Sequence, residues 1–139
     1  MTTIPGETNV QDLLNVYEEA RWTWARATGE AIDCRAAIVE YDLAIKGFEA
    51  NVALDPSIDG KNKEVRDAQV FRLLEADPGY MKLMENRNRE ERARQHHEAA
   101  AEDAVHAMRG VRLSVEWETA LVAREAAMSG SRDLAGRRE

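Results

Sequence analysis

The chain has 139 residues, a formal net charge of −7 and one cysteine. Charged residues make up 32% of it and apolar residues 44%, a balance that excludes both a disordered chain and a membrane protein. It has no apolar run of the roughly 18 residues that a bilayer span needs, and its start, MTTIPGETNV, lacks the regions of a signal peptide. We therefore expect one cytoplasmic domain without a disulfide or a membrane contact.

Two long stretches rich in Ala, Glu, Arg and Leu predict helices over about Glu7–Leu54 and Pro78–Met128. Between them, the segment DPSIDGKNK from Asp55 to Lys63 predicts a loop, because it gathers Pro, Ser, Asp, Gly and Asn. A short helix over about Lys63–Ala76 follows this loop.

Asp77 and Pro78 fit the N-cap and first position of the second long helix. The polar residues 129–139 are expected to form a flexible tail. The predicted fold is therefore all-α: residues 1–128 form a long antiparallel, coiled-coil-like helical hairpin with a short connecting helix, and this hairpin dimerises into a helical bundle.

The first long helix carries a heptad repeat on one face, which we call the seam. Its members are Val10, Leu13, Tyr17, Ala20, Trp24, Ala27, Ala31, Cys34, Ile38, Tyr41, Ile45, Phe48 and Val52. All are apolar or aromatic, and they alternate steps of three and four residues, as in a coiled coil. A helix of this length needs a long partner helix to cover the seam.

A second apolar face, which we call the stripe, lies roughly 150° around the same helix. Its members are Trp22, Ala25, Gly29, Ile32, Ala36, Val39 and Leu43. A helix that is apolar on two nearly opposite faces is normally buried between neighbours. The short helix, a second copy of the chain or a different protein could cover the stripe, and we expect a homodimer formed through it.

The second long helix is apolar only in its C-terminal half. Its segment Asn86–Glu98, NRNREERARQHHE, has one apolar residue, Ala93, and would lie opposite Ile38 and Ile45 in a simple hairpin. We therefore expect three or more helices to meet near the hairpin tip.

Four arginines stand close together in this polar segment: Arg87, Arg89, Arg92 and Arg94. They are candidates for polar contacts, including contacts with nucleic-acid phosphates. Glutamates are interleaved with them and no aromatic residue is present for base stacking. Because Glu90 and Arg94 have the spacing of a helical ion pair, the pattern favours a solvated, salt-bridged face.

Three histidines raise the question of a metal site. His106 follows Glu102 by four residues and Asp103 by three, but no second copy of this pattern exists. A zinc site needs three or four converging ligands. We expect no metal and no cofactor, and we do not assign His96 or His97 as ligands.

The single cysteine, Cys34, lies on the seam and is expected to act as a small apolar residue rather than as a nucleophile. The acidic pairs Glu18 with Glu19 and Glu30 with Asp33 resemble the magnesium ligands of helical pyrophosphatases, but such spacing is common in acidic helices. We therefore expect no catalytic residue.

The run IDGKNKEVRDAQV, Ile58 to Val70, stands between the long helices and resembles small helical accessory proteins of tailed bacteriophages. The specific part of the likeness is Gly60, Lys61, Asn62, Arg66 and Gln69. The resemblance implies a phage origin, a setting in the cytoplasm of the infected cell and action by binding.

The predicted function is that of a non-enzymatic protein-binding module that engages a host or phage protein. One alternative is a structural or assembly component, such as a scaffolding or virion protein. Another is an accessory protein of DNA metabolism that uses the arginine cluster.

Overall fold

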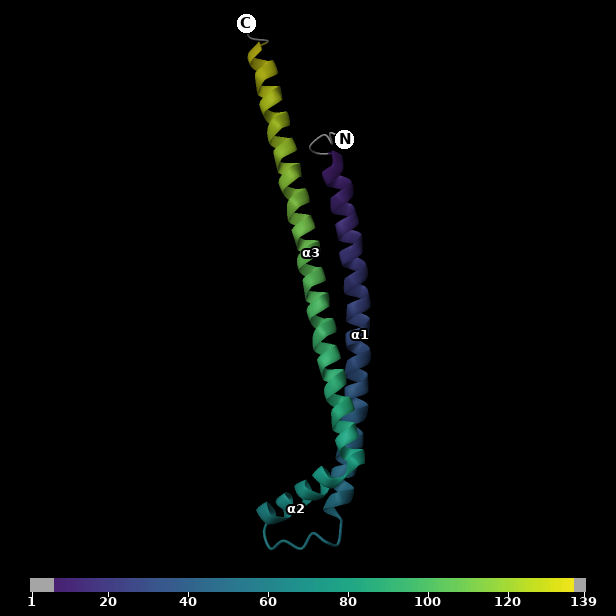
Figure 1. Cartoon of the computed structure of the whole chain (residues 1–139). Coiled ribbons are helices and arrows are strands. Elements are labelled where there is room, and N and C mark those ends of the chain that lie inside the picture. The colour runs from purple at the N-terminus through teal and green to yellow at the C-terminus, as the bar shows by residue number, and fades with distance from the viewer. Residues whose placement is uncertain (1–6, 137–139) are drawn as a thin grey trace. The chain divides into compact units, whose positions relative to one another are not determined.

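The computed structural model describes the backbone of residues 7–136 and the side chains of residues 10–131. Within that range the chain forms three helices and no strand: α1 (Glu7–Ala53), α2 (Lys63–Ala76) and α3 (Pro78–Gly136). The long helices α1 and α3 pack closely against each other with opposite chain directions, and α2 connects them (Figure 1). The predicted all-α helical hairpin is thereby confirmed.

The helix boundaries follow the prediction except at one end. The short helix α2 has the predicted bounds, and α1 ends at Ala53, beside the predicted Leu54. The predicted end of the second long helix at Met128 is wrong, because α3 continues to Gly136. Residues 129–136 contain no proline, and Gly130 among them weakens a helix without breaking it. The rest of the predicted tail, 137–139, lies outside the described residues. None of the described helices combines the length and the apolarity that crossing a bilayer requires.

The chain divides into two compact units. The turn unit comprises Arg26–Ala99 and contains the C-terminal part of α1, all of α2 and the start of α3. The terminal unit comprises Met1–Ala25 and Ala100–Glu139, described here over 7–25 and 100–136.

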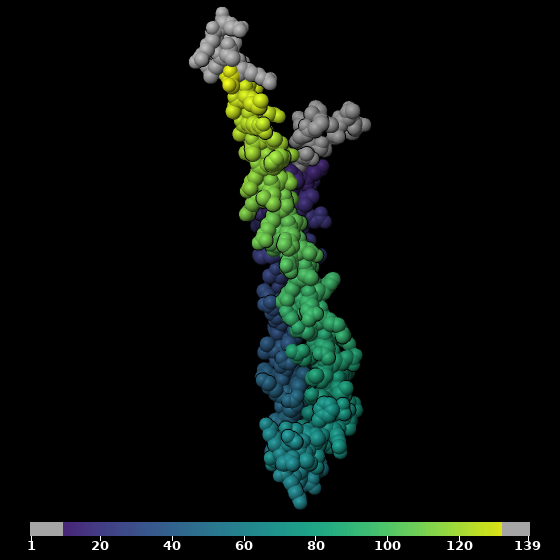
Figure 2. Space-filling view, turned by 90° about the vertical axis from the view of Figure 1, so that its left-hand side faces the viewer, coloured from purple at the N-terminus to yellow at the C-terminus, as the bar shows by residue number. Residues whose placement is uncertain are grey.

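The core of the turn unit consists of seam residues. Ala27, Ala31, Cys34, Ile38 and Ile45 on α1 are buried, and Leu74 on α2 is buried as well. Figure 2 shows α2 and the loop before it gathered at one end of this unit, next to the adjoining ends of α1 and α3. The seam is therefore confirmed here, and three helices meet at the tip as predicted.

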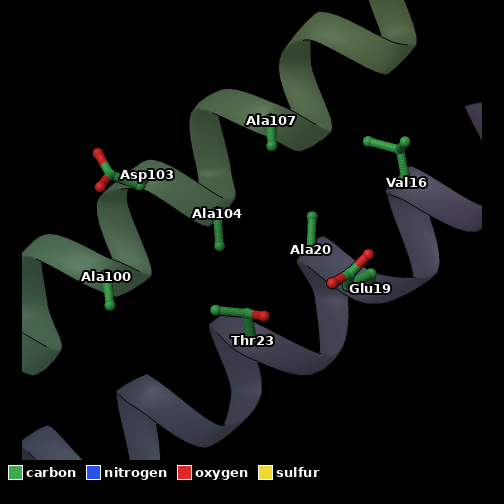
Figure 3. Close-up of a pocket in the computed structure, with 8 residues that line it drawn as sticks. All are labelled: Val16, Glu19, Ala20, Thr23, Ala100, Asp103, Ala104 and Ala107. Atoms are coloured by element: carbon green, nitrogen blue, oxygen red, sulfur yellow. The ribbon is translucent and has the colours of Figure 1, made fainter.

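Small side chains bring α1 and α3 together in the terminal unit. Ala20 on α1 and Ala104 on α3 are buried, and their methyl groups point toward each other across the helix contact (Figure 3). Farther along, an apolar groove of about 370 Å³ opens between the helices, and its lining includes Val10, Leu13 and Val115. Val10 and Val115 are exposed, so one hairpin covers the seam only in part.

The loop before α2 is held by residues of the motif Ile58–Val70. Asn62 caps α2, since its Oδ1 accepts a hydrogen bond from the Val65 backbone N–H at 2.9 Å. Gln69 accepts a bond from the Gly60 N–H at 3.1 Å and donates one to Asp59 at 2.9 Å. These motif residues therefore have a structural role in fixing the loop on α2.

Asp77 and Pro78 start α3 as predicted. The Asp77 Oδ1 accepts a hydrogen bond from the Gly79 N–H at 2.8 Å and another from the Tyr80 N–H at 3.3 Å. Tyr80 then packs its ring 6.3 Å from the ring of Phe48 on α1. The cap thus connects the end of α2 to the hairpin contact at the tip.

Candidate protein-binding surface

The stripe is exposed on α1 in the turn unit. Ile32 and Val39 each have 58% of their surface exposed and Leu43 has 65%, while Gly29 and Ala36 between them are also exposed. The short helix α2 does not cover these residues, which removes one of the three possible covers. The stripe is therefore an open, ordered apolar surface on one face of a helix.

The first two stripe residues, Trp22 and Ala25, belong to the terminal unit and are exposed too. Trp22 is 78% exposed and lines a surface hollow together with Glu18, Arg21 and Ala25. A tryptophan this exposed is unusual for a residue of its size and typical of a binding contact.

A third apolar row lies on α3 of the terminal unit, where the sequence places bulky apolar residues away from the face that contacts α1. Leu113, Trp117 and Leu121 are spaced by four residues and are all exposed. The i, i+4, i+8 spacing was a usable signal, because it places all three on one face of a helix. They lie on another face than Val111, which is buried at the contact with α1.

The arginine cluster is salt-bridged as predicted, but it is only partly solvated, which corrects the other half of the prediction. The Arg87 Nε donates a hydrogen bond to Asp42 on α1 at 2.7 Å, and 30% of its side chain is exposed. Arg94 pairs with Glu91 and Glu98, and 24% of its side chain is exposed. Arg89 and Arg92 are exposed as predicted.

The predicted partner of Arg94 was also wrong. Its guanidinium binds Glu91, three residues before it, and Glu98, four residues after it, instead of Glu90. Glu90 is half-buried, and its carboxylate forms a hydrogen bond with the thiol of Cys34 on α1. Glu90, which the helical spacing assigned to Arg94, therefore interacts with α1 instead.

Carboxylates on both long helices explain why a polar segment lies beside the seam. Glu98 on α3 is bound by Arg35 on α1 and by Arg94, and these bonds, Arg35 first, lower the pKa of Glu98 below its ordinary value of 4.5. Hydrogen bonding to Arg94 likewise lowers the pKa of Glu91. Asp42 raises the pKa of Arg87. The polar side chains pair at the flanks of the contact while the seam residues fill its centre.

The histidines do not converge with other ligands. His97 Nδ1 lies 2.9 Å from a carboxylate oxygen of Glu30 on α1, and the His96 ring contacts the His97 ring edge-on. His106 lies 3.8 Å from Glu102, and both side chains are exposed. Within the described part of the chain, no three His, Cys, Asp or Glu side chains are grouped so that they could hold a metal ion.

Cys34 is buried on the seam, as its apolar role requires. Burial raises the pKa of its thiol, and the Glu90 hydrogen bond and charge raise it further. A thiol in this setting stays protonated, whereas a nucleophilic cysteine needs a lowered pKa. Its surroundings therefore favour packing over reactivity.

Comparisons with known proteins add no relative to this description. No protein-family model matches the chain, and neither a curated protein nor a solved structure is similar to it.

Proposed function

We propose that the protein acts by binding another protein through the stripe on α1. The observation that carries this proposal is the exposure of Ile32, Val39 and Leu43 on one ordered helical face. Apolar anchors at helical spacing are a common means of helix-to-helix recognition. An uncovered row of this kind would promote aggregation in a protein that had no partner for it.

The surroundings of the reactive side chains also support binding rather than catalysis. Cys34 is buried with a raised thiol pKa, which disfavours a nucleophilic role. The alternative role in DNA metabolism is weakened because three of its four cations, Arg87, Arg89 and Arg94, pair with carboxylates. The phage setting of this binding role rests on the resemblance around Gly60.

Photo-crosslinking tests this proposal without knowing the partner. A benzophenone amino acid replaces Val39 on the stripe or, as a control, Ala44, an exposed residue on another face of α1. Irradiation in bacterial cells that produce the protein should give a defined protein–protein adduct from position 39 and none from position 44. Adducts that are absent from both positions, or equal at both, would contradict the proposal.

A further inference from the structure

We infer that the stripe of the turn unit binds the same stripe of a second copy, with the two α1 helices antiparallel. This inference rests on the proposed function and names its partner. The surface concerned consists of Gly29, Ile32, Ala36 and Val39, with Leu43 at its end, and all five residues are exposed in the single chain.

The partner of this surface must present a long apolar row of its own. Within Arg26–Ala99, all of which the structure describes, α3 is polar from Asn86 to Glu98. The short helix α2 exposes Val65 and Phe71 but has only 14 residues. The stripe on α1 is the long apolar row of this unit, so a second copy supplies a matching surface by two-fold symmetry.

The sizes of the stripe residues fit an antiparallel pair. Small residues, Gly29 and Ala36, alternate with large ones, Ile32 and Val39. With the two-fold axis at the level of Cys34, Gly29 of one copy faces Val39 of the other, and Ala36 faces Ile32. Each layer then joins a small residue to a large one, which fills space without voids. A parallel pair would place Gly29 against Gly29 and leave a gap there.

One pair of opposite charges beside the stripe fits the same register. In an antiparallel pair, the residues on one side of the stripe lie next to the residues on the same side of the other copy's stripe. Arg26 of each copy therefore faces Glu40 of the other, and both side chains are exposed. Asp33 and Arg35 lie near the axis, where each faces its own counterpart and the like charges oppose the pairing, although Arg35 is already bound to Glu98. A parallel pair would instead bring opposite flanks together, with Asp33 facing Thr28 and Arg35 facing Glu40, so the side-chain sizes rather than the charges favour the antiparallel pair.

Light scattering and sedimentation equilibrium test the pairing. Purified wild type should be a dimer at micromolar concentration, and the variant with Ile32→Glu and Val39→Glu should be a monomer that is still helical by circular dichroism. Arg26→Glu should weaken the dimer roughly 2- to 30-fold, since it breaks two symmetry-related ion pairs. Adding Glu40→Arg should restore the affinity, and Asp33→Asn should strengthen it.

A cysteine pair tests the orientation in a Cys34→Ala background. In the antiparallel dimer, a short bismaleimide should link two chains that carry Asp33→Cys, close to the axis. Chains that carry Lys46→Cys should not be linked, because their thiols would lie about 36 Å apart along the helices. Linking at position 46 and not at 33 would show a parallel pair and overturn the inference.

The outcome also separates this inference from the proposed function. A monomeric wild type whose position 39 crosslinks to a different protein would overturn the pairing of copies and leave the binding role intact. A dimer that is unaffected by Ile32→Glu with Val39→Glu would overturn the inference as well, because another surface would then hold the copies together.

Discussion

His97 on α3 lies with its Nδ1 atom 2.9 Å from a carboxylate oxygen of Glu30 on α1. The Arg87–Asp42 pair joins the same two helices at 2.7 Å. Both pairs lie within the turn unit and connect a polar part of α3 to a helix whose centre is apolar. Because each pair joins a residue of α1 to a residue of α3, the two pairs favour one alignment among those that the alternating seam residues allow.

Removing Arg94 should make stability depend less on pH. Glu91 and Glu98 have ordinary pKa values of 4.5, and in the folded chain both are lowered: Glu91 by Arg94, and Glu98 by Arg35 first and Arg94 second. When folding lowers the pKa of a carboxyl group, the resulting stabilisation is fully present at pH values above the unfolded-state pKa. It is lost as the pH falls through the folded-state pKa. The melting midpoint of wild type should therefore exceed that of Arg94→Gln at about pH 7, and the two midpoints should converge as the pH falls below the ordinary carboxyl pKa of 4.5.

Thermal melts followed by circular dichroism across this pH range measure the effect. Arg92→Gln is the matched control, because Arg92 is exposed on the same helix. It should melt near wild type at every pH. A difference between wild type and Arg94→Gln that does not change with pH would show that Arg94 acts through the packing of its stem and not through these carboxylates.

Charge on the seam should unfold the turn unit. Ile38 and Ile45 are 9% and 7% exposed, and aspartate at either position would bury a carboxylate without a partner. We expect each change to lower the free energy of unfolding by about 3 kcal/mol or more. Ala44→Asp adds the same charge to an exposed face of α1 and should cost about 0.5 to 1 kcal/mol. Equal urea midpoints for Ile38→Asp and Ala44→Asp would contradict a buried seam.

The sequence predicts the bounds of α2 because local chemistry sets them. Asn62 caps its start, and Asp77 with Pro78 begins the next helix. The seam was equally predictable, since its period is visible in one helix alone. The role of Arg87 was not, because its partner Asp42 is distant in sequence. The partners of Arg94, Glu91 and Glu98, stand at helical spacing, but spacing alone does not choose between them and Glu90. Helical spacing within the segment reports only neighbours on the same helix.

Adding a methyl group at two glycines should change stability in opposite directions. A Cβ at Gly60 would lie 2.8 Å from the Val65 Cγ1 and 2.9 Å from the Arg66 backbone nitrogen, so Gly60→Ala must displace the start of α2. We expect it to lower the free energy of unfolding by about 1 to 3 kcal/mol. A Cβ at Gly47, inside α1, would meet nothing within 4 Å.

Gly47→Ala should therefore raise the free energy of unfolding by about 0.5 to 1 kcal/mol, because alanine restricts the unfolded chain and favours a helix. Chemical denaturation of both variants beside wild type measures the two shifts. Destabilisation by Gly47→Ala, or a neutral Gly60→Ala, would contradict the packing around these residues.

The thiol of Cys34 should react slowly in the folded protein. It is buried, and burial together with the Glu90 hydrogen bond raises its pKa, so at about pH 8 the reactive thiolate is scarce and the reagent has little access. A chromogenic disulfide reagent should therefore label it much faster in denaturant than in buffer.

The comparison protein combines Cys34→Ala with Ala44→Cys, which places one thiol on an exposed position of α1 and should react rapidly when folded. Glu90→Gln should accelerate labelling of Cys34, because it removes a negative charge that opposes the thiolate. Native labelling of Cys34 as fast as the exposed control would show that the thiol is open to solvent, and would restore the possibility of a reactive cysteine on the seam.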